Sequence, residues 1–308
     1  MDTSVPGTIL VPLDGSRFEM QALPIVQRLA LATRARAVLL RIVRNRGPHE
    51  LSERDAAEQV AAQAAERLRT AGVTAVAEAC AGPRLACIVR HATLWRADLI
   101  VMADVGRGRL ARFLWGGGAG DTLVRTSLVP VMLVPAHPNP PRAPVEGPVL
   151  AVVDGSAEDG STVQHARRLA RALSLGIVLL RAVTPPPPVL GTDCVPTLPA
   201  TDELLLEARG YVRELALGLR GEAGVATSGE AVVGPAAGTI VEHAEAWDAA
   251  AIVLGPSAWT DPLLGGRGSV AGRVLARTPR PVLCAPAITL APGHESVGGA
   301  PGATAAVV

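Results

Sequence analysis

The eight residues ILVPLDGS, Ile9–Ser16, return 140 positions later as VLAVVDGS, Val149–Ser156. Each copy is a short apolar run that is followed by Asp-Gly-Ser. An apolar run of this length that ends in turn residues predicts a buried β-strand with a tight turn at its carboxyl end. Two copies of this unit in one chain predict a fold that is built twice.

Further repeated blocks extend outward from this pair. VLLRIV, Val38–Val43, matches VLLRAV, Val178–Val183, at the same offset of 140 positions. Gly82–Ala103 matches Gly234–Gly255 at an offset of 152, so 12 extra residues lie between these blocks in the second half. The proline-rich segment Thr184–Ala200 occupies this interval and is predicted to be mostly a loop. Matched blocks in one order indicate a duplicated domain.

Short apolar runs alternate with longer amphipathic stretches in the first half. The runs are apolar throughout, which is typical of strands in a sheet that is covered on both faces. We therefore predict an α/β protein with two tandem Rossmann-like domains, each a doubly wound, five-stranded parallel sheet with helices on both faces. The predicted strands are Thr8–Leu13, Ala37–Val43, Val73–Cys80, Leu99–Ala103 and Val131–Val134, and the predicted helices are Glu19–Thr33, Ser52–Ala71, Arg84–Trp95 and Ala119–Thr126.

Proline content marks the expected domain borders. The stretch Pro135–Pro148 holds too many prolines for a helix or an interior strand, so it predicts a stiff linker. We expect a first domain over residues 1–136, a linker over 137–147, a second domain over 148–287 and a flexible tail over 288–308. The tail is rich in glycine and alanine and has no hydrophobic period.

Composition excludes several classes of function. The 308 residues include 29 Lys+Arg and 28 Asp+Glu, so the net charge of +1 predicts no nucleic-acid or anionic-membrane partner. Aromatic residues make up only 2% of the chain, which argues against stacking on single-stranded nucleic acid. The apolar runs are too short to span a membrane, and no secretory signal is recognisable, so a cytoplasmic protein is predicted. The four cysteines have no CxxC or metal-ligand spacing and are predicted to be reduced, mostly buried thiols.

Carboxylates follow the first predicted strand of each half. Asp14 and Asp154 both stand before Gly-Ser. In doubly wound sheets, ligands bind at the carboxyl ends of the strands, where the strand order reverses. A carboxylate at this place is able to accept a hydrogen bond from a ribose hydroxyl or a base amine. The same residues also suit a plain helix-capping turn, so both interpretations stay open.

Glycine-rich loops follow the fourth predicted strand of each half, over Ala103–Leu123 and Gly255–Leu275. Glycines let backbone N–H groups approach an anion closely, and the start of a helix adds the positive end of its dipole. Gly268 and Ser269 in the second loop therefore predict either the distal part of a phosphate loop or a helix cap.

The ordered set of ILVPLDGS, ADLIVMA and the closing GS…RVLARTPRPVL, with their counterparts in the other half, resembles a tandem universal stress protein. The resemblance covers almost all of Thr8–Ala287 and leaves out the linker, the proline-rich insertion and the tail. It implies a flavodoxin-like sheet of order 3-2-1-4-5 in each half and, in some members, a bound ATP.

The nucleotide-binding members of that family share G-x2-G-x9-G-[S/T] after the fourth strand, and hold adenine between the first-strand Asp and an apolar residue near the end of the second strand. The second half matches three of the four motif positions, and an alanine replaces the second glycine. It therefore carries the better-preserved site. The resemblance therefore implies ATP, alone or with magnesium, at Val152, Val153, Asp154, Ala182, Gly255, Ala258, Gly268, Ser269 and Val270. The degenerate first-half counterparts, which lack the Ser/Thr, are Pro12, Leu13, Asp14, Ile42, Ala103, Gly106, Gly116 and Gly117.

Paired histidines and tryptophans receive structural interpretations. His91 and His243 are equivalent helix positions with no ligand partner at suitable spacing, and we expect structural or surface roles. Trp95 and Trp247 are expected to pack helix against sheet. Trp115 and Trp259 lie in the candidate ligand loops, where they would pack the loop, contact the other domain or cover a nucleotide.

The sequence holds no Ser-His-Asp order, HExxH motif, phosphate-binding lysine or paired catalytic carboxylates at the strand ends. We therefore expect a non-catalytic, ATP-binding stress-response protein without a metal site. The alternatives are a nucleotide-free member of the family that acts through protein–protein contacts, and a weak ATPase. The last strands, Val131–Val134 and Val282–Ala285, are expected to pair the halves as an internal pseudo-dimer, because an apolar edge strand favours pairing. Two chains are expected to associate further as a homodimer.

Overall fold

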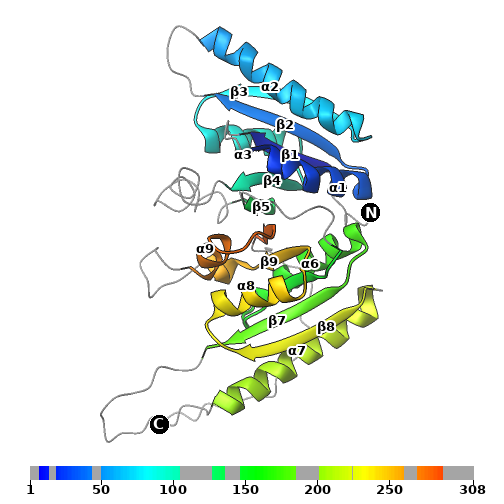
Figure 1. Cartoon of the computed structure of the whole chain (residues 1–308), viewed down its shortest axis with the longest axis vertical. Coiled ribbons are helices and arrows are strands. Elements are labelled where there is room, and N and C mark those ends of the chain that lie inside the picture. Colours follow the sequence, from blue (N-terminus) through cyan, green and yellow to red (C-terminus); the bar gives the residue numbers. More distant parts are fainter. Residues whose placement is uncertain are drawn as a thin grey trace, which may run out of the picture.

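The computed structural model describes residues 7–13, 19–43, 50–104, 127–135, 146–184, 201–223, 225–259 and 269–286. Within these ranges the strands form one ten-stranded sheet in the order β3-β2-β1-β4-β5-β10-β9-β6-β7-β8 (Figure 1). The strands are β1 (Thr8–Leu13), β2 (Arg36–Val43), β3 (Ala75–Ala81), β4 (Leu99–Asp104), β5 (Val131–Pro135), β6 (Val149–Val152), β7 (Ile177–Val183), β8 (Thr227–Val233), β9 (Ala251–Leu254) and β10 (Val282–Cys284).

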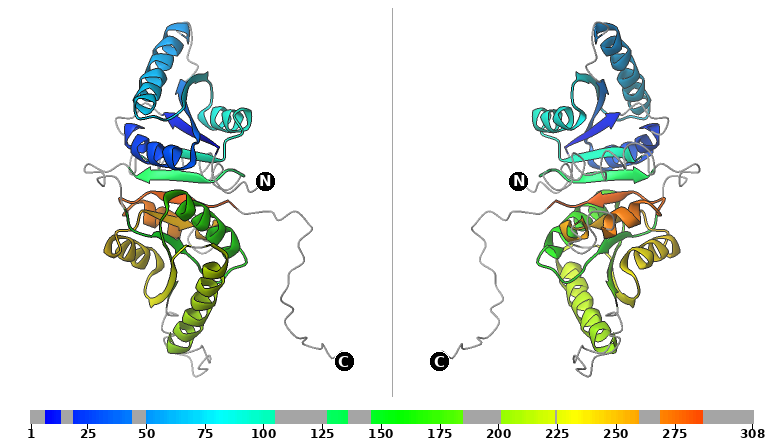
Figure 2. Two further views of the ribbon diagram at one scale, coloured as in Figure 1. Left: turned by 90° about the vertical axis from the view of Figure 1, so that its right-hand side faces the viewer. Right: turned by 90° about the vertical axis from the view of Figure 1, so that its left-hand side faces the viewer.

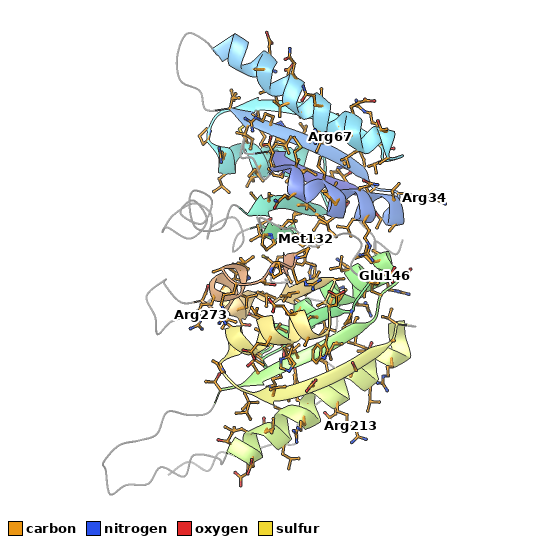
Figure 3. The ribbon with its side chains drawn as sticks, in the orientation of Figure 1. Arg34, Arg67, Met132, Glu146, Arg213 and Arg273 are labelled. Atoms are coloured by element: carbon orange, nitrogen blue, oxygen red, sulfur yellow. A yellow bond between two sulfur atoms is a disulfide. The ribbon has the colours of Figure 1, made fainter. Side chains whose placement is uncertain are left out.

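Each half contributes five parallel strands in the order 3-2-1-4-5, as the family resemblance implied. The second half repeats this order and direction. The two halves join where β5 and β10 pair antiparallel, with Met132 opposite Leu283. Figure 3 labels Met132 at this junction. The predicted pairing of the two last strands is therefore confirmed.

Helices cover both faces of the sheet, and alternate strand residues point into two large cores, with a third, small cluster of Val183, Ala208 and Ala231. One core packs strand residues such as Val11 and Leu39 against α1, α2, α6 and α7. The other packs neighbours such as Leu10 and Leu40 against α3, α8 and α9. The helices are η1 (Glu19–Ala22, a 3-10 turn), α1 (Leu23–Thr33), α2 (Glu50–Thr70), α3 (Arg84–Leu94), α6 (Asp159–Leu173), α7 (Thr201–Ala223), α8 (Ala236–Ala246), η2 (Pro256–Trp259, a 3-10 turn) and α9 (Val270–Leu275).

Contacts between helices also cross the junction of the halves. Helix α1 of the first half contacts α6 of the second half on their shared face of the sheet. In the two side views of Figure 2 the halves meet along the centre of the molecule, and Figure 1 places α2 and α7 toward its opposite ends. None of the described helices combines the length and apolar character that a membrane-spanning helix needs.

The largest local difference from the predicted elements is at the first helix, which divides into η1 and α1. Pro24 is near the start of α1. Proline has no N–H and its ring clashes with the carbonyl four residues earlier, so a continuous α-helix from Glu19 is excluded. The third strand begins at Ala75 rather than Val73, because the Val73 N–H donates to Leu68 O in the turn that ends α2. The predicted helix 119–126 lies outside the described residues.

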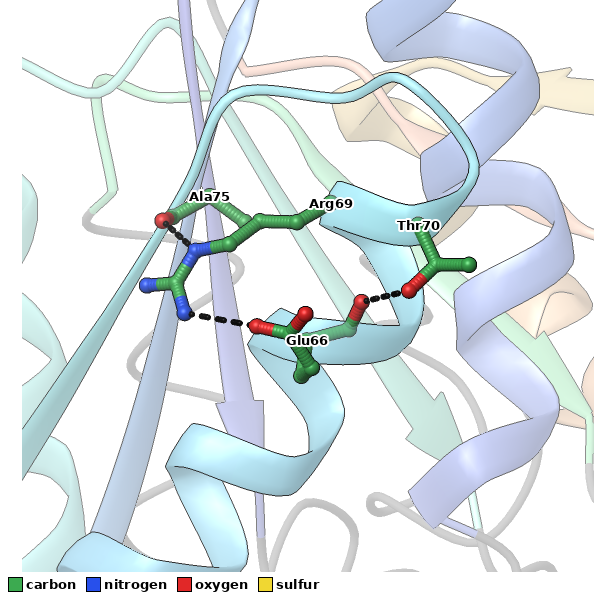
Figure 4. Close-up of polar contacts among 4 residues, drawn as sticks. All are labelled: Glu66, Arg69, Thr70 and Ala75. Atoms are coloured by element: carbon green, nitrogen blue, oxygen red, sulfur yellow. Dashed lines mark hydrogen bonds and ion pairs between the residues drawn. The ribbon is translucent and has the colours of Figure 1, made fainter.

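Arginines fasten the ends of the long helices to the strands that follow them. Arg69 Nε donates to Ala75 O at 3.0 Å, and Arg69 Nη1 lies 3.3 Å from Glu66 Oε2 (Figure 4). Arg220 repeats the contact in the second half, where its Nε donates to Thr227 O at 2.6 Å. The duplication thus extends to side-chain contacts.

One prediction about the cysteines is wrong. Cys80 and Cys87 form a disulfide between the end of β3 and the first turns of α3, with their Cα atoms 6.3 Å apart. Cys284 is a buried free thiol, as predicted. The seven-residue spacing of Cys80 and Cys87 resembles no short redox motif, and only the β3–α3 turn brings the two sulfur atoms together.

Candidate functional site

Asp154 lies in a hydrogen-bonded turn just beyond β6. Its Oδ1 accepts the N–H of Ser156 at 2.8 Å, which closes an Asx turn. Gly155 between them has φ +91°, a left-handed backbone that favours glycine. Val153 is buried and its N–H donates to Leu180 O, so this segment continues alongside β7. The Asp154 side chain is exposed at the carboxyl end of β6 and is therefore accessible to a ligand.

Asp159, at the start of α6, binds the backbone of this turn. Its carboxylate accepts the Asp154 N–H at 3.2 Å and the Gly155 N–H at 2.8 Å. The Tyr211 hydroxyl on α7 donates to Asp159 Oδ2 at 2.7 Å. The Arg181 guanidinium lies over the Tyr211 ring, with Cζ 5.2 Å from the ring centroid. The turn that presents Asp154 is thus supported by three elements.

The two carboxylates have opposite pKa shifts. Partial loss of water contact raises the pKa of Asp154, but hydrogen bonds from the Ser156 and Ser257 side chains and from the Ser156 N–H outweigh it, so this pKa lies below its ordinary value. Burial raises the pKa of Asp159, and its hydrogen bonds from Tyr211 and the backbone offset this only in part. Asp154 is therefore held in its ionised form, as an acceptor at the sheet edge.

Ser257 connects this turn to the loop after β9. It lies in η2, and its side chain hydrogen-bonds Asp154. Strand β6 lies between β7 and β9, so the order of connection reverses between β6 and β9. Asp154 and Ser257 therefore flank the reversal point, which is the usual ligand position in an open α/β sheet.

Gly255 has a packing reason to be glycine. A Cβ built at this position would clash with Thr162 Oγ1 of α6. Gly255 is not among the residues with positive φ, so close approach rather than backbone conformation excludes a side chain. The repeat places Ala103 and Ala22 at these two positions in the first half, and neither residue carries a hydroxyl. The first glycine of the motif and its loss in the first half are both explained by this contact.

Ala258, which replaces the second glycine of the motif, is unstrained. It lies in η2, its N–H donates to Gly255 O at 3.2 Å, and its φ is not positive. An alanine therefore fits here without the cost of a left-handed backbone. The neighbouring Trp259 is 3% exposed and packs in the core beneath α8 and α9. Of the roles predicted for Trp259, the structure supports packing.

Ser269 is the N-cap of α9. Its Oγ accepts the N–H of Gly272 at 3.1 Å, which satisfies one free donor at the start of the helix. Val270 follows it and is partly exposed. The hydroxyl proton of Ser269 is still available to donate, since the cap uses only an acceptor lone pair. Helix capping is therefore shown, and it is compatible with an anion at the same hydroxyl.

The remaining predicted residues divide between described and undescribed ranges. Ala182 is partly exposed and pairs with Val232, and Val152 is partly exposed at the end of β6. In the first half Pro12, Leu13 and Ile42 are buried at the ends of β1 and β2, and Ala103 is buried near the end of β4. Predicted residues outside the described ranges are Asp14, Gly106, Gly116, Gly117 and Gly268.

The first-half counterpart of Asp159 has a described contact with an arginine. Glu19, equivalent to Asp159, forms an ion pair with Arg41 at 3.1 Å between Oε2 and Nη1. Arg41 is equivalent to Arg181, which instead stacks on Tyr211. Among the described contacts, the acidic residue of the first half pairs with an arginine, and that of the second half accepts hydrogen bonds from the turn.

Asp159, Tyr211, Thr162 and Ser257 were not predicted as site residues. Asp159 stands three residues after Ser156, a spacing that is typical of a helix start with reciprocal capping. That pattern was a usable signal for Asp159. Tyr211 and Thr162 carry no local signal, because α7 and α6 bring them to the site only in the folded sheet.

The paired histidines have the predicted structural roles, as do Trp95 and Trp247, whereas Trp115 lies outside the described residues. His91 and His243 place Nδ1 2.8 Å from the carbonyl oxygen one helical turn earlier, Cys87 O and Thr239 O respectively. Trp95 and Trp247 pack between helix and sheet. Among the described residues, no group of three or more His, Cys, Asp or Glu side chains is placed to hold a metal ion.

The fold is that of a tandem doubly wound α/β protein. Its candidate ligand site is at the carboxyl end of β6, where the strand order reverses and the Asp154 carboxylate is exposed. Comparison with known families identifies the protein further: residues 7–135 and 147–286 each match the Universal stress protein family. The chain belongs to the universal stress protein family.

Solved structures share the whole tandem architecture. A universal stress protein from Archaeoglobus fulgidus has a TM-score of 0.65 at 18% identity, over 90% of this chain and 94% of that chain. A putative universal stress protein from Pseudomonas aeruginosa has a TM-score of 0.57 at 21% identity, over 92% and 94%. The cytoplasmic domain of a prokaryotic cation chloride cotransporter has a TM-score of 0.51 at 12% identity, over 90% and 94%. At these levels of identity, the similarities show a shared fold and no more. A search of curated proteins found no match.

Proposed function

We propose that the second domain of this universal stress protein binds ATP, and that binding rather than turnover is its role in a stress response. The observation that carries the proposal is the ionised, exposed Asp154 carboxylate at the point where the strand order reverses. A fixed acceptor at this point suits a ribose hydroxyl or an adenine amine. Asp159 and Tyr211 keep the acceptor in place before any ligand arrives.

The described residues of the second half are compatible with the nucleotide. Ala182 and Val152 leave partly exposed apolar surface beside Asp154 for the adenine ring. Ser269 would donate its hydroxyl proton to a phosphate while its oxygen keeps the helix cap. A hydrogen bond to a charged group contributes about 1.5–3 kcal/mol, which corresponds to about a ten- to hundredfold gain in affinity. Magnesium, where present, would accompany the phosphates.

The test separates the capping and binding roles of Ser269. In wild-type protein, ATP with magnesium at about one hundred times its Kd should stabilise the fold by about 2.7 kcal/mol, measured as a thermal shift. Ser269→Asp keeps a good N-cap but places a negative charge toward the phosphates. We expect Ser269→Asp to retain the nucleotide-free Tm and to lose most of the ATP shift. Ser269→Thr, the matched control, should keep both.

Asp154→Asn provides the second arm of this test, because it removes the charge and keeps the shape of the side chain. We expect it to weaken ATP binding, as measured by calorimetric titration, while Asp14→Asn in the first half leaves the ATP affinity unchanged. An ATP shift that persists in both Asp154→Asn and Ser269→Asp would contradict a second-half site. No shift at millimolar ATP would contradict ATP binding altogether.

The second candidate is a nucleotide-free family member that acts through protein–protein contacts. It is favoured by the Thr162–Gly255 contact, because that contact accounts for the first motif glycine without any ligand. The ATP titration above distinguishes the two candidates.

A weak ATPase is the third candidate. It is tested by measuring ADP release from the same samples, with Asp154→Asn as the comparison. We also propose that the protein is cytoplasmic and that two tandem chains form a homodimer.

A further inference from the structure

The disulfide between Cys80 and Cys87 closes the corner between β3 and α3. Cys80 is the second-last residue of β3, and Cys87 lies in the first turns of α3. Cys80 is in register with Ile42, the residue at the end of β2 that is the first-half counterpart of Ala182. The disulfide therefore lies at the carboxyl edge of the first-half sheet, away from the second-half site proposed above.

The second half forms the same corner without cysteines. The repeat places Val232 and Thr239 at the positions of Cys80 and Cys87. Thr239 Oγ1 lies beneath Gly234 as Cys87 Sγ lies beneath Gly82, since a Cβ built at either glycine would meet that side chain. A valine and a threonine thus pack a corner of this type, so the fold does not require a cross-link there.

A cation accompanies the two cysteines. Arg90 Nη2 lies 3.1 Å from Cys80 Sγ, and Arg90 is one turn beyond Cys87 on α3. The repeat places Glu242 at the equivalent position in the second half. A guanidinium at this distance stabilises a thiolate on Cys80, whereas a carboxylate would oppose one. Both cysteines and the cation occur in one half, and all three are replaced in the other.

From this juxtaposition we propose that Cys80 and Cys87 form a thiol–disulfide exchange site whose co-substrates are small dithiols and their disulfides. A thiolate of the dithiol attacks Cys87 Sγ, the Cys80–Cys87 bond breaks, and Cys80 leaves as a thiolate beside Arg90. The second thiolate of the reagent then attacks the reagent sulfur that is bonded to Cys87. This closes the reagent's disulfide and releases Cys87 as a thiolate. The reagent is oxidised to its disulfide and supplies two electrons and two protons. Both cysteines are at most 4% exposed, which favours small reagents over protein partners.

The first measurement is a redox titration of the folded chain in mixtures of reduced and oxidised dithiothreitol. Free thiols are trapped with a maleimide and located by mass spectrometry. We expect Cys80 and Cys87 to gain and lose the label together as one two-electron couple, with Cys284 outside that couple. The variant Cys80→Val/Cys87→Thr, which carries the second-half residues, is the fold-preserving control and should show no couple.

The second measurement tests the role of Arg90. In reduced protein, we expect Arg90→Glu to slow alkylation of Cys80 by iodoacetamide about tenfold, because one unit of thiol pKa changes the thiolate fraction about tenfold. Arg90→Lys keeps the charge and should stay near wild type, as should Arg67→Glu, an exposed charge reversal on α2. Arg90→Gln replaces Arg90→Glu if the latter does not fold.

Three outcomes would overturn the proposal. A disulfide that persists in fully reduced dithiothreitol excludes reversible exchange, and so do two free thiols that persist in fully oxidised dithiothreitol. Equal alkylation rates in wild type and in the Arg90 charge variants exclude activation of Cys80 by Arg90. None of these outcomes depends on ATP binding, so they are independent of the proposed function.

Discussion

At the scale of single residues, Gly255 and Thr162 explain one another. Thr162 Oγ1 occupies the space that a side chain at Gly255 would need, and the first half has alanine at both equivalent positions. A glycine in a nucleotide-binding motif therefore has two physical explanations at this position, close approach of a ligand and close approach of a neighbouring helix. Substitution at both residues separates them.

We predict that Gly255→Ala lowers the free energy of unfolding by about 1–3 kcal/mol, the usual cost of overpacking a dense core. Thr162→Ala/Gly255→Ala, which copies the first-half pair, should recover most of this loss, with a coupling energy of about 0.5–3 kcal/mol in urea denaturation. Ala103→Gly in the first half is the control and should show no such coupling with Thr162→Ala. Additive effects at 162 and 255 would refute the packing explanation.

His165 on α6 makes stability depend on pH. Burial lowers its pKa below the ordinary value of 6.5, and nearby Arg168 adds to the shift, while the hydrogen bond to Ser161 O opposes it. A base whose pKa is lower in the folded state binds fewer protons when folded, so its stabilising contribution is lost as the pH falls below 6.5.

We predict that His165→Ile, which installs the first-half residue Ile25, flattens this dependence. Urea denaturation at several values between about pH 7 and about pH 5 measures the slope of the free energy of unfolding. The wild type should lose more stability on acidification than the variant. Equal slopes would mean that His165 takes up a proton as readily in the folded chain as in the unfolded one.

At the scale of elements, much of the fold was predictable because local signals and tertiary needs agree. The first strand was predicted at its observed bounds, Thr8–Leu13, because a buried parallel strand is apolar throughout and ends at a turn. The η1–α1 division was missed, although Pro24 carried the signal. The Cys80–Cys87 bond was missed because it depends on the angle between β3 and α3, which no local pattern encodes.

The candidate site was predictable only in part, for the same reason. Asp154 and Ser269 were predictable as candidates because Asp154 follows a recognisable strand and Ser269 precedes a recognisable helix. Their partners Ser257 and Tyr211 come from elements that are distant in sequence, and the sheet order alone brings them together. The explanation of Gly255 by Thr162 also needed the fold, since a motif does not reveal which neighbour fills the space.

The disulfide gives a prediction about the stability of the β3–α3 corner. The disulfide joins two cysteines that are seven positions apart, and reduction removes this constraint on the unfolded chain. The gain in chain entropy predicts a loss of about 2–3 kcal/mol in the free energy of unfolding. Urea denaturation with and without dithiothreitol measures this loss. Cys80→Val/Cys87→Thr should be insensitive to the reductant. A wild-type midpoint that does not move on verified reduction would contradict the prediction.

At the scale of the whole molecule, the two domains share one sheet. Met132 and Leu283 pair across the junction and both are almost fully buried in the core that also includes α1 and α6. Each half would expose an apolar edge strand without the other. This continuity implies that the stability of each half depends on the other, although each copy of the fold has the size of an independent domain.

We predict that damage to the outer sheet of the first half destabilises the second half. Leu39 on β2 is fully buried and distant from the junction in the strand order, and Leu39→Ala should cost about 2–5 kcal/mol. In a Trp95→Phe/Trp115→Phe background, the remaining tryptophans, Trp247 and Trp259, report only on the second half. Because the halves share a sheet and a core, the Leu39→Ala substitution should lower the urea midpoint that the fluorescence of these two tryptophans reports. An unchanged midpoint would mean that the second half keeps its structure after the first unfolds, and that the β5–β10 pairing joins two independent folding units.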